Sequence, residues 1–198
     1  MSVTTGSKVS EIFERTRAEG RAALIAYYGV GYPTVADSLE VYRTLVENGA
    51  DIIEVGIPYS DPVLDGLVIQ LAGDLARENG FHIPHTFDAV RTITQAGGVA
   101  VVMSYWNVIL HYGVENFARD LAEAGGSGII TPDLIPDEAG EWLAAAQKYG
   151  LDPIFLVAPS STAERLAMTV GHCRGFVYVA STMGVTGVRS EVGSPAKA

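Results

Sequence analysis

The sequence has few of the features that mark secreted, membrane-spanning or nucleic-acid-binding proteins. Cys173 is the only cysteine, so no disulfide forms within the chain, as is usual in a reducing cytosol. No apolar run reaches the ~18 residues that a transmembrane helix needs, and residues 1–8 lack the apolar core of a signal peptide. The 13 basic residues form no cluster and are outnumbered by 23 acidic ones. We therefore expect a cytoplasmic protein that binds neither membranes nor nucleic acids.

Apolar residues, by contrast, are plentiful. They make up 48% of the 198 residues, and charged residues make up 18%, which suits one globular domain with a substantial core. The net charge of −10 still permits a small anionic substrate, because a few backbone amides can hold a phosphate group in an acidic protein.

Apolar periodicity predicts helices that alternate with short strands. The predicted strands are 22–28, 52–56, 99–104, 128–131, 154–157 and 175–180. The predicted helices are 10–19, 35–48, 68–79, 84–95, 115–124, 137–149 and 162–170. This order indicates βα units and a parallel sheet, and polar or glycine-containing segments follow the strands. In a (β/α)8 barrel, the segments that follow the strands form one rim, and that rim holds the active site. Periodicity alone does not distinguish such a barrel from a doubly wound sheet.

One apolar strand carries a carboxylate, Glu54. Side chains alternate along strand 52–56, so Glu54 points away from the face that holds Ile53 and Val55. Both faces of the strand are apolar, and an ionised carboxylate there is costly unless it is paired, hydrogen-bonded or used in chemistry. The spacing leaves two interpretations open: a catalytic carboxylate, or a structural glutamate bonded to backbone or to a basic partner.

Five segments resemble the tryptophan synthase alpha subunit family, most closely its actinobacterial branch. They are E-V-G-I-P-Y-S-D-P-V-L-D-G at 54–66, M-S-Y-W-N at 103–107, P-D-L-I-P-D-E at 132–138, F-L-V-A-P-S-S at 155–161 and G-F-V-Y-V-A-S-T-M-G-V-T-G at 175–187. The similarity runs in register from about residue 19 to residue 187. It implies a TIM (β/α)8-type barrel and a lyase of tryptophan biosynthesis. The implied reaction is cleavage of indole-3-glycerol phosphate to indole and glyceraldehyde 3-phosphate, a retro-aldol step without a metal.

The resemblance implies catalytic roles for Glu54 and Asp65. Glu54 would lie against apolar walls, and burial would raise its pKa enough for it to donate and accept protons near neutral pH. Asp65, on the loop after the strand, would be wetter and ionised, and would hold the indole N–H. One fold can thus separate the roles of two acids by environment.

The resemblance also implies substrate contacts and a protein partner. The substrate-binding positions are Tyr27, Tyr105, Ile130, Tyr178, Thr186 and Gly187, the last two within a mobile lid. For Tyr178, core packing beside Phe176 is the alternative. The positions implied to face a beta subunit are Asp61, Asn107 and Asp133. The family assembles as alpha2beta2, and pyridoxal phosphate is expected only in the beta subunit, with no cofactor in this chain.

The resemblance fades after Gly187, where the family continues into two more βα units. We expect residues 1–187 to form a partial barrel of about six βα units and residues 188–198 to form a tail without predicted structure. The first and sixth strands would be unpaired edges, and the family's main phosphate-binding loops would be missing. If the chain ends at residue 198, we expect a weak or inactive lyase. The alternative is a non-catalytic remnant that only docks on a beta subunit.

Several other features have plainer interpretations. Four carboxylates could be read as oxygen ligands for Mg²⁺: Asp51, Glu54, Asp61 and Asp65. We disfavour that site because Asp51 is expected in the turn before its strand and the family uses no metal. His82 and His85 lack a third zinc ligand. Ser160 and Ser161 are expected to cap a helix rather than act as nucleophiles. Another phosphate-binding barrel enzyme, such as indole-3-glycerol phosphate synthase, is disfavoured because no lysine follows a strand.

Overall fold

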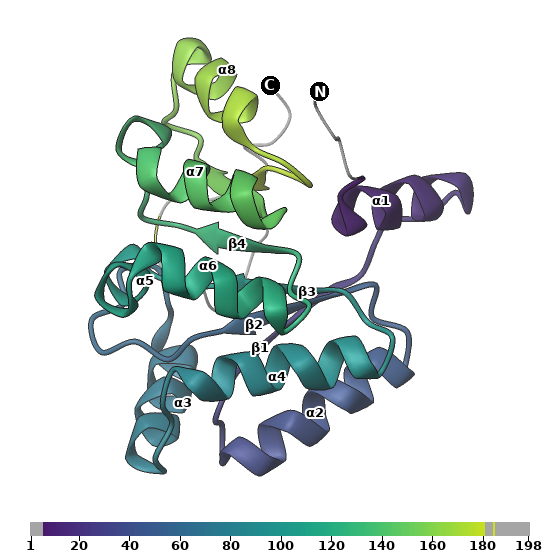
Figure 1. Cartoon of the computed structure of the whole chain (residues 1–198), viewed down its shortest axis with the longest axis vertical. Coiled ribbons are helices and arrows are strands. Elements are labelled where there is room, and N and C mark those ends of the chain that lie inside the picture. The colour runs from purple at the N-terminus through teal and green to yellow at the C-terminus, as the bar shows by residue number, and fades with distance from the viewer. Residues whose placement is uncertain (1–5, 181–183, 185–198) are drawn as a thin grey trace.

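A computed structural model describes residues 6–180 and 184, which form a curved parallel sheet with helices along its outer face (Figure 1). The strands are β1 (Ile25–Gly29), β2 (Ile52–Gly56), β3 (Ala100–Met103), β4 (Gly128–Thr131), β5 (Asp152–Val157) and β6 (Tyr178–Val179). The helices are α1 (Lys8–Ala18), α2 (Val35–Glu47), α3 (Leu67–Glu78), α4 (Pro84–Gln95), α5 (Trp106–Tyr112), α6 (Val114–Glu123), α7 (Gly140–Tyr149) and α8 (Ala163–His172), with a 3₁₀ turn η1 (Pro136–Glu138).

The strands are ordered β1-β2-β3-β4-β5-β6, and every neighbouring pair is parallel. A doubly wound sheet reverses its strand order at a switch point, and this sheet does not. Strands that follow one another in a single direction around a curve are typical of a TIM barrel. The partial barrel of six βα units is confirmed. Among the described residues, β1 pairs only with β2 and β6 only with β5, so both are edges.

The two faces of the sheet bury two separate apolar clusters. Outward side chains such as Ile53 and Val55 pack against the helices in the larger cluster, together with Trp142 of α7. Inward side chains such as Ile52 and Ile130 form the smaller cluster inside the curve. This division follows from the two-residue period of a strand, and it confirms that Glu54 shares the inner face with Ile52.

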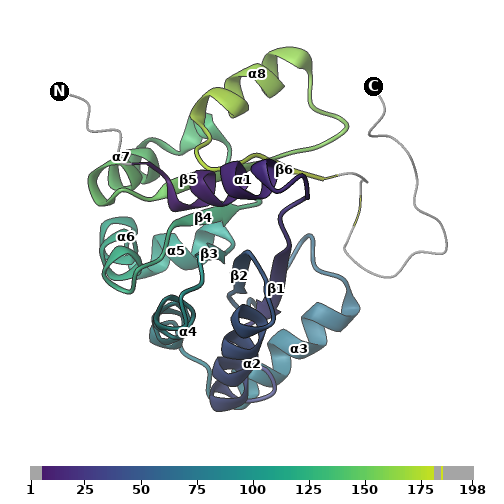
Figure 2. The ribbon, with the colours of Figure 1, turned by 90° about the vertical axis from the view of Figure 1, so that its right-hand side faces the viewer.

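Helix α1 closes the end of the curve at which the strands begin, and Figure 2 shows it beside β5 and β6. Its Val9 and Ile12 belong to the inner cluster, and Phe13 meets Phe176 edge to face at 5.7 Å between ring centroids. At the start of α1, the N-cap Ser7 donates a hydrogen bond to the buried carboxylate of Asp152 in β5.

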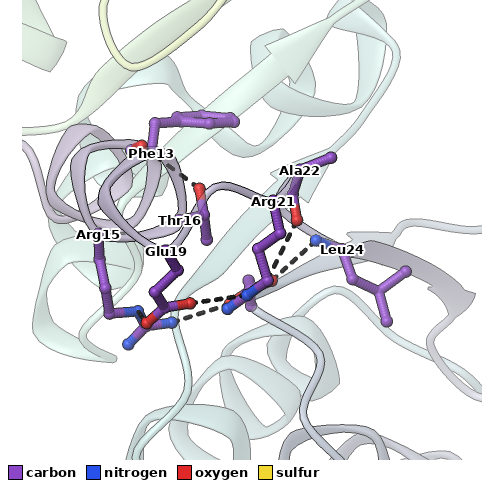
Figure 3. A network of polar contacts seen from close by, with 8 residues as sticks. Phe13, Arg15, Thr16, Glu19, Arg21, Ala22 and Leu24 are labelled. Atoms are coloured by element: carbon purple, nitrogen blue, oxygen red, sulfur yellow. Dashed lines mark hydrogen bonds and ion pairs between the residues drawn. The ribbon is translucent and has the colours of Figure 1, made fainter.

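A second buried carboxylate, that of Asp51, holds the other end of α1, and Figure 3 labels Arg15, Arg21 and Leu24, which contact it. Asp51, 5% exposed, accepts hydrogen bonds from Arg15 at 2.8 Å, from Arg21 at 2.6 and 2.8 Å, and from the Leu24 backbone N–H at 2.8 Å. The hydrogen bonds from Arg21 hold the pKa of Asp51 well below its usual range. Asp51 precedes β2 as predicted, and its oxygens are occupied by these two cations.

Two sequence-based predictions of local structure are wrong, those of the sixth strand and of the N-cap of α8, and one helix was not predicted. The sixth strand is only Tyr178–Val179, because Gly175 has a φ of +76° and Arg174 donates its N–H to Pro153. Helix α5 was not predicted, because its N-terminal Trp106 N–H is capped by Asp133 from beyond the next strand.

The N-cap of α8 is Thr162 rather than Ser160 or Ser161. The Thr162 side chain accepts the Arg165 N–H, whereas Ser161 Oγ accepts the Ala158 N–H within the preceding turn. No helix within residues 6–180 is both long and apolar enough to cross a membrane.

Candidate active site

Glu54 lies on the inner face of β2 and is 6% exposed. Its Oε1 has no hydrogen-bond partner among the described residues, so the interpretation as a structural, bonded glutamate gains no support at that oxygen. Burial raises its pKa to about 7, because the apolar surroundings disfavour the charged form. Such a carboxyl can both donate and accept a proton near neutral pH.

Asp65 lies on the loop between β2 and α3 and is more exposed than Glu54, as the sequence predicts. It lines a pocket with Tyr27, Met103 and Tyr105 at the carboxyl ends of the strands. Burial raises the pKa of Asp65, and a hydrogen bond with the Tyr105 side chain lowers it and so opposes that shift. Glu54 and Asp65 therefore differ in exposure, although burial raises the pKa of both.

Tyr27 is a neighbour of both carboxyl groups. It is aligned with Glu54 across the β1–β2 ladder, and its ring lines the same pocket as Asp65. Burial is the main reason that the Tyr27 pKa is raised far above its ordinary value, followed by the nearby charges of Asp65 and Glu54. Glu54 and Asp65 thus each lie next to the same tyrosine, one along the β1–β2 ladder and the other in the pocket lining.

Gly56 leaves the space that the Tyr27 ring occupies. A Cβ atom at Gly56 would lie 2.3 Å from Tyr27 Oη and 2.5 Å from two ring carbons. Gly29, its partner across the ladder, has no atom within 4 Å of such a Cβ. Only one of these two aligned glycines is therefore required by packing.

We expect Gly56→Ala to displace the Tyr27 ring and to lower the free energy of unfolding by about 1–3 kcal/mol, the usual cost of overpacking. Urea unfolding and the tyrosine ring signals in NMR spectra measure both effects. Gly29→Ala is the matched control and should change neither. Equal effects of the two substitutions would contradict the packing argument.

The structure places the other predicted substrate residues in two groups. Tyr27 and Tyr105 line the pocket with Asp65. Ile130 is fully buried in the inner cluster, and Tyr178 packs on that cluster together with Phe176. The pKa of Tyr178 is raised by burial and, to a smaller extent, by the charge of Glu54, and the ring packs on the inner cluster. The predicted Thr186 and Gly187 lie outside the described residues.

The three residues predicted to face a partner are all exposed and follow the strands. Asp61 accepts a hydrogen bond from Ser60 Oγ, and Asp133 accepts from the Trp106 N–H at 2.9 Å. Asn107 Nδ2 donates to Tyr59 Oη at 3.2 Å. The structure thus brings these side chains to the same rim as the pocket.

Sequence reasoning missed one residue of this rim, Tyr59. Its ring stacks on Tyr105 with 5.0 Å between centroids and 27° between planes. It also lines a second pocket with Tyr27, Gly56 and Asp65. The only signal in the sequence was an aromatic residue directly after Pro58, which by itself does not indicate a contact with the next strand exit.

Within residues 6–180, no group of three or more histidine, cysteine, aspartate or glutamate side chains is arranged to hold a metal ion. His82 and His85 contact each other instead, since His85 Nδ1 accepts the His82 backbone N–H at 3.0 Å.

Comparisons with known proteins give one consistent result. The family model described as "Tryptophan synthase alpha chain" matches residues 13–197. The tryptophan synthase alpha chain of Mycobacteroides abscessus is 59% identical over 196 residues, which cover 99% of this chain and 75% of the relative. That of Nocardia farcinica is 57% identical, with coverage of 97% and 72%.

Solved structures agree with these sequence matches. A structure of Mycobacterium tuberculosis tryptophan synthase superposes with a TM-score of 0.91 at 59% identity, and the match covers 93% of this chain and 72% of the other. The alpha subunit of Legionella pneumophila gives a TM-score of 0.84 at 32% identity, with coverage of 89% and 68%. The chain thus spans about three quarters of the length of its relatives, and it belongs to the tryptophan synthase alpha chain family.

Proposed function

We propose that this chain cleaves indole-3-glycerol phosphate to indole and glyceraldehyde 3-phosphate, with Glu54 and Asp65 as its catalytic residues. The observation that carries this proposal is the position of the two carboxyl groups, each next to Tyr27: Glu54 is aligned with Tyr27 across the β1–β2 ladder, and Asp65 lines a pocket with Tyr27. Glu54 is deeply buried and has a pKa of about 7, whereas Asp65 is less buried and lines the pocket.

The reaction places distinct demands on two acids. The side-chain hydroxyl next to the indole must lose its proton, so that its oxygen forms the carbonyl of glyceraldehyde 3-phosphate. Indole C3 takes up a proton while it is still bonded to the side chain, which leaves positive charge on the indole nitrogen. The electrons of the broken carbon–carbon bond then return to the ring and restore neutral indole. Glu54 fits the proton transfers because its pKa is near neutrality. Asp65 fits the second role, because its carboxylate can accept a hydrogen bond from the indole N–H. It can also stabilise the positive charge that develops on the indole nitrogen.

Tyr27, Tyr105, Ile130 and Tyr178 would enclose the indole ring, and Thr186 and Gly187 would belong to a closing lid. The chain itself would bind no cofactor and would act in the cytoplasm. Structures of the Mycobacterium tuberculosis relative are of tryptophan synthase, one of them in an aminoacrylate-bound form. We infer that a beta chain docks at the rim of Asp61, Asn107 and Asp133, in an alpha2beta2 assembly in which the beta chain holds pyridoxal phosphate.

The test is indole release from indole-3-glycerol phosphate by the purified chain, measured with and without an actinobacterial beta chain. We expect indole release that increases with the beta chain and is lost in Asp65→Asn. A matched control is Asp74→Asn, at an exposed position of α3 where the carboxylate pairs with Arg77. Docking of the beta chain without indole release would instead favour a non-catalytic partner of that chain.

A further inference from the structure

The backbone of the loop that carries Asp65 is held both before and after the side chain of that residue. Before it, the Leu64 N–H donates to Tyr105 Oη at 3.0 Å. After it, the Asp65 carbonyl oxygen accepts a hydrogen bond from Gln70 Nε2 at 2.7 Å. Because peptide units are planar, only the backbone dihedrals of Leu64 and Asp65 lie between these two held groups. The direction in which the Asp65 side chain leaves the loop therefore depends on both contacts.

Helix α3 gives the contact from Gln70 a rigid base. Gln70 is the fourth residue of α3, and its backbone N–H donates to the carbonyl oxygen of the N-cap Gly66 at 3.0 Å. Side chains of a helix point back toward its N-terminus. The Gln70 side chain thus reaches the residue that precedes the N-cap, which is Asp65.

The chemistry of this contact determines which end of the Gln70 side chain faces the loop. A carbonyl oxygen can only accept, so Gln70 must present its NH₂ group, and an apolar or ionised acidic side chain could not replace it. Gln70 is half-buried and lines a pocket together with Tyr27 and Asp65. The hydrogen bond is therefore made at the candidate site and not on the outer surface of α3.

We propose that Gln70 is a positioning residue for Asp65: the hydrogen bond from its side-chain amide to the Asp65 carbonyl oxygen sets the direction in which the Asp65 carboxylate leaves the loop. This role rests on the proposed function of Asp65. Gln70 itself transfers no proton, because an amide does not titrate in the range in which the enzyme would work. Its contribution is the placement of the acid, and misplacement by about 1 Å can lower a rate by about 10²-fold.

The kinetic test compares Gln70→Met with the unchanged chain in the assay of indole release. Methionine is similar to glutamine in length and helix propensity but has no donor. We expect kcat to fall by about 10–100-fold while KM changes by less than about threefold, because Asp65 acts on charge that develops only in the transition state. Gln147→Met, at an exposed position of α7, is the matched control and should change neither constant.

An NMR measurement on the whole chain detects the hydrogen bond itself and needs no activity. The Asp65 carbonyl ¹³C signal, observed through the amide of Gly66, should move upfield in Gln70→Met because the carbonyl loses a donor. It should stay in place in Gln147→Met. If Gln70→Met fails to fold, the unchanged chain gives the answer: one side-chain amide proton of Gln70 should lie downfield of the corresponding proton of Gln147.

The two measurements separate this inference from the proposed function. If every form of the chain is inactive but the Asp65 carbonyl signal moves as expected, the positioning of the loop holds and the catalytic role of Asp65 fails. An unmoved carbonyl signal, or a Gln70 amide proton at the same position as that of Gln147, overturns the inference and leaves the proposed function intact. An unchanged kcat in a folded Gln70→Met variant of an active chain also overturns it. So does a KM that rises as much as kcat falls, because Gln70 would then be a substrate contact.

Discussion

Glu54→Gln is expected to lower the rate of indole release by about 10²–10⁴-fold, the usual contribution of a positioned acid–base group. Glutamine keeps the shape of the side chain but cannot transfer a proton. Because the pKa of Glu54 is about 7, the rate of the unchanged chain should also depend on pH around neutrality, whereas the residual rate of the variant should not.

The same substitution is expected to stabilise the fold at alkaline pH. The folded-state pKa of Glu54, about 7, is raised above the ~4.3 of an unfolded glutamate. Folding therefore favours the protonated form, and stability falls as pH rises from about 4 to 7. Above pH 7 the ionised, buried carboxyl costs about 2–4 kcal/mol. Urea unfolding should thus find Glu54→Gln more stable than the unchanged chain at pH 8 and nearly equal to it at pH 4.

A purely structural glutamate would behave in the opposite way, with stability lost on substitution at neutral pH. Glu47→Gln, at an exposed position of α2, is the matched control and should change neither rate nor stability. A Glu54→Gln variant that retains the full rate of indole release would remove this residue from the mechanism.

Asp51→Asn should lower the free energy of unfolding at neutral pH by about 2–3 kcal/mol. The carboxylate is buried and accepts four hydrogen bonds, three of them from guanidinium groups. Breaking a buried pair costs about 3–5 kcal/mol. Because the side chains of Arg15 and Arg21 are half-exposed, solvent screens part of that amount.

The pH dependence of this loss has a defined sign. The folded-state pKa of Asp51 lies below its unfolded value of about 3.9, so its stabilising contribution is complete above pH 4 and disappears as pH falls further. Thermal unfolding at pH 7 and pH 3 measures the difference. Asp88→Asn removes an exposed i,i+3 pair with Arg91 and should cost less than about 0.5 kcal/mol at either pH. If Asp51→Asn and Asp88→Asn lowered the free energy of unfolding by equal amounts, the burial of Asp51 would add nothing to its stabilising contribution.

Local periodicity was enough to predict the order of elements and the face of β2 that carries Glu54. Alternation places Ile52 inside and Ile53 outside, and the two apolar clusters divide in that way. The apolar character of the strand also predicted the direction of the Glu54 pKa shift, because both depend on the same neighbours.

Contacts between distant parts of the chain could not be predicted in this way. The partners of Asp51 lie 27 to 36 residues earlier, and nothing in the spacing selects Arg15 and Arg21 from the other arginines. The Tyr105 hydroxyl meets the backbone of Leu64, 41 residues away, although the resemblance gave Tyr105 only an apolar role. Helix α5 escaped prediction for the same reason, since its cap comes from Asp133.

The hydrogen bond from Ser7 to Asp152 joins residues 145 positions apart. A growing polypeptide leaves the ribosome from its N-terminus, so α1 emerges long before β5, the strand that carries Asp152, has been made. Limited proteolysis of nascent chains of increasing length should find Lys8–Ala18 protected only after Asp152 has emerged. Helix α1, the first of the described elements, is therefore among the last of them to settle, and translation beyond β5 sets the time at which this end of the sheet can close.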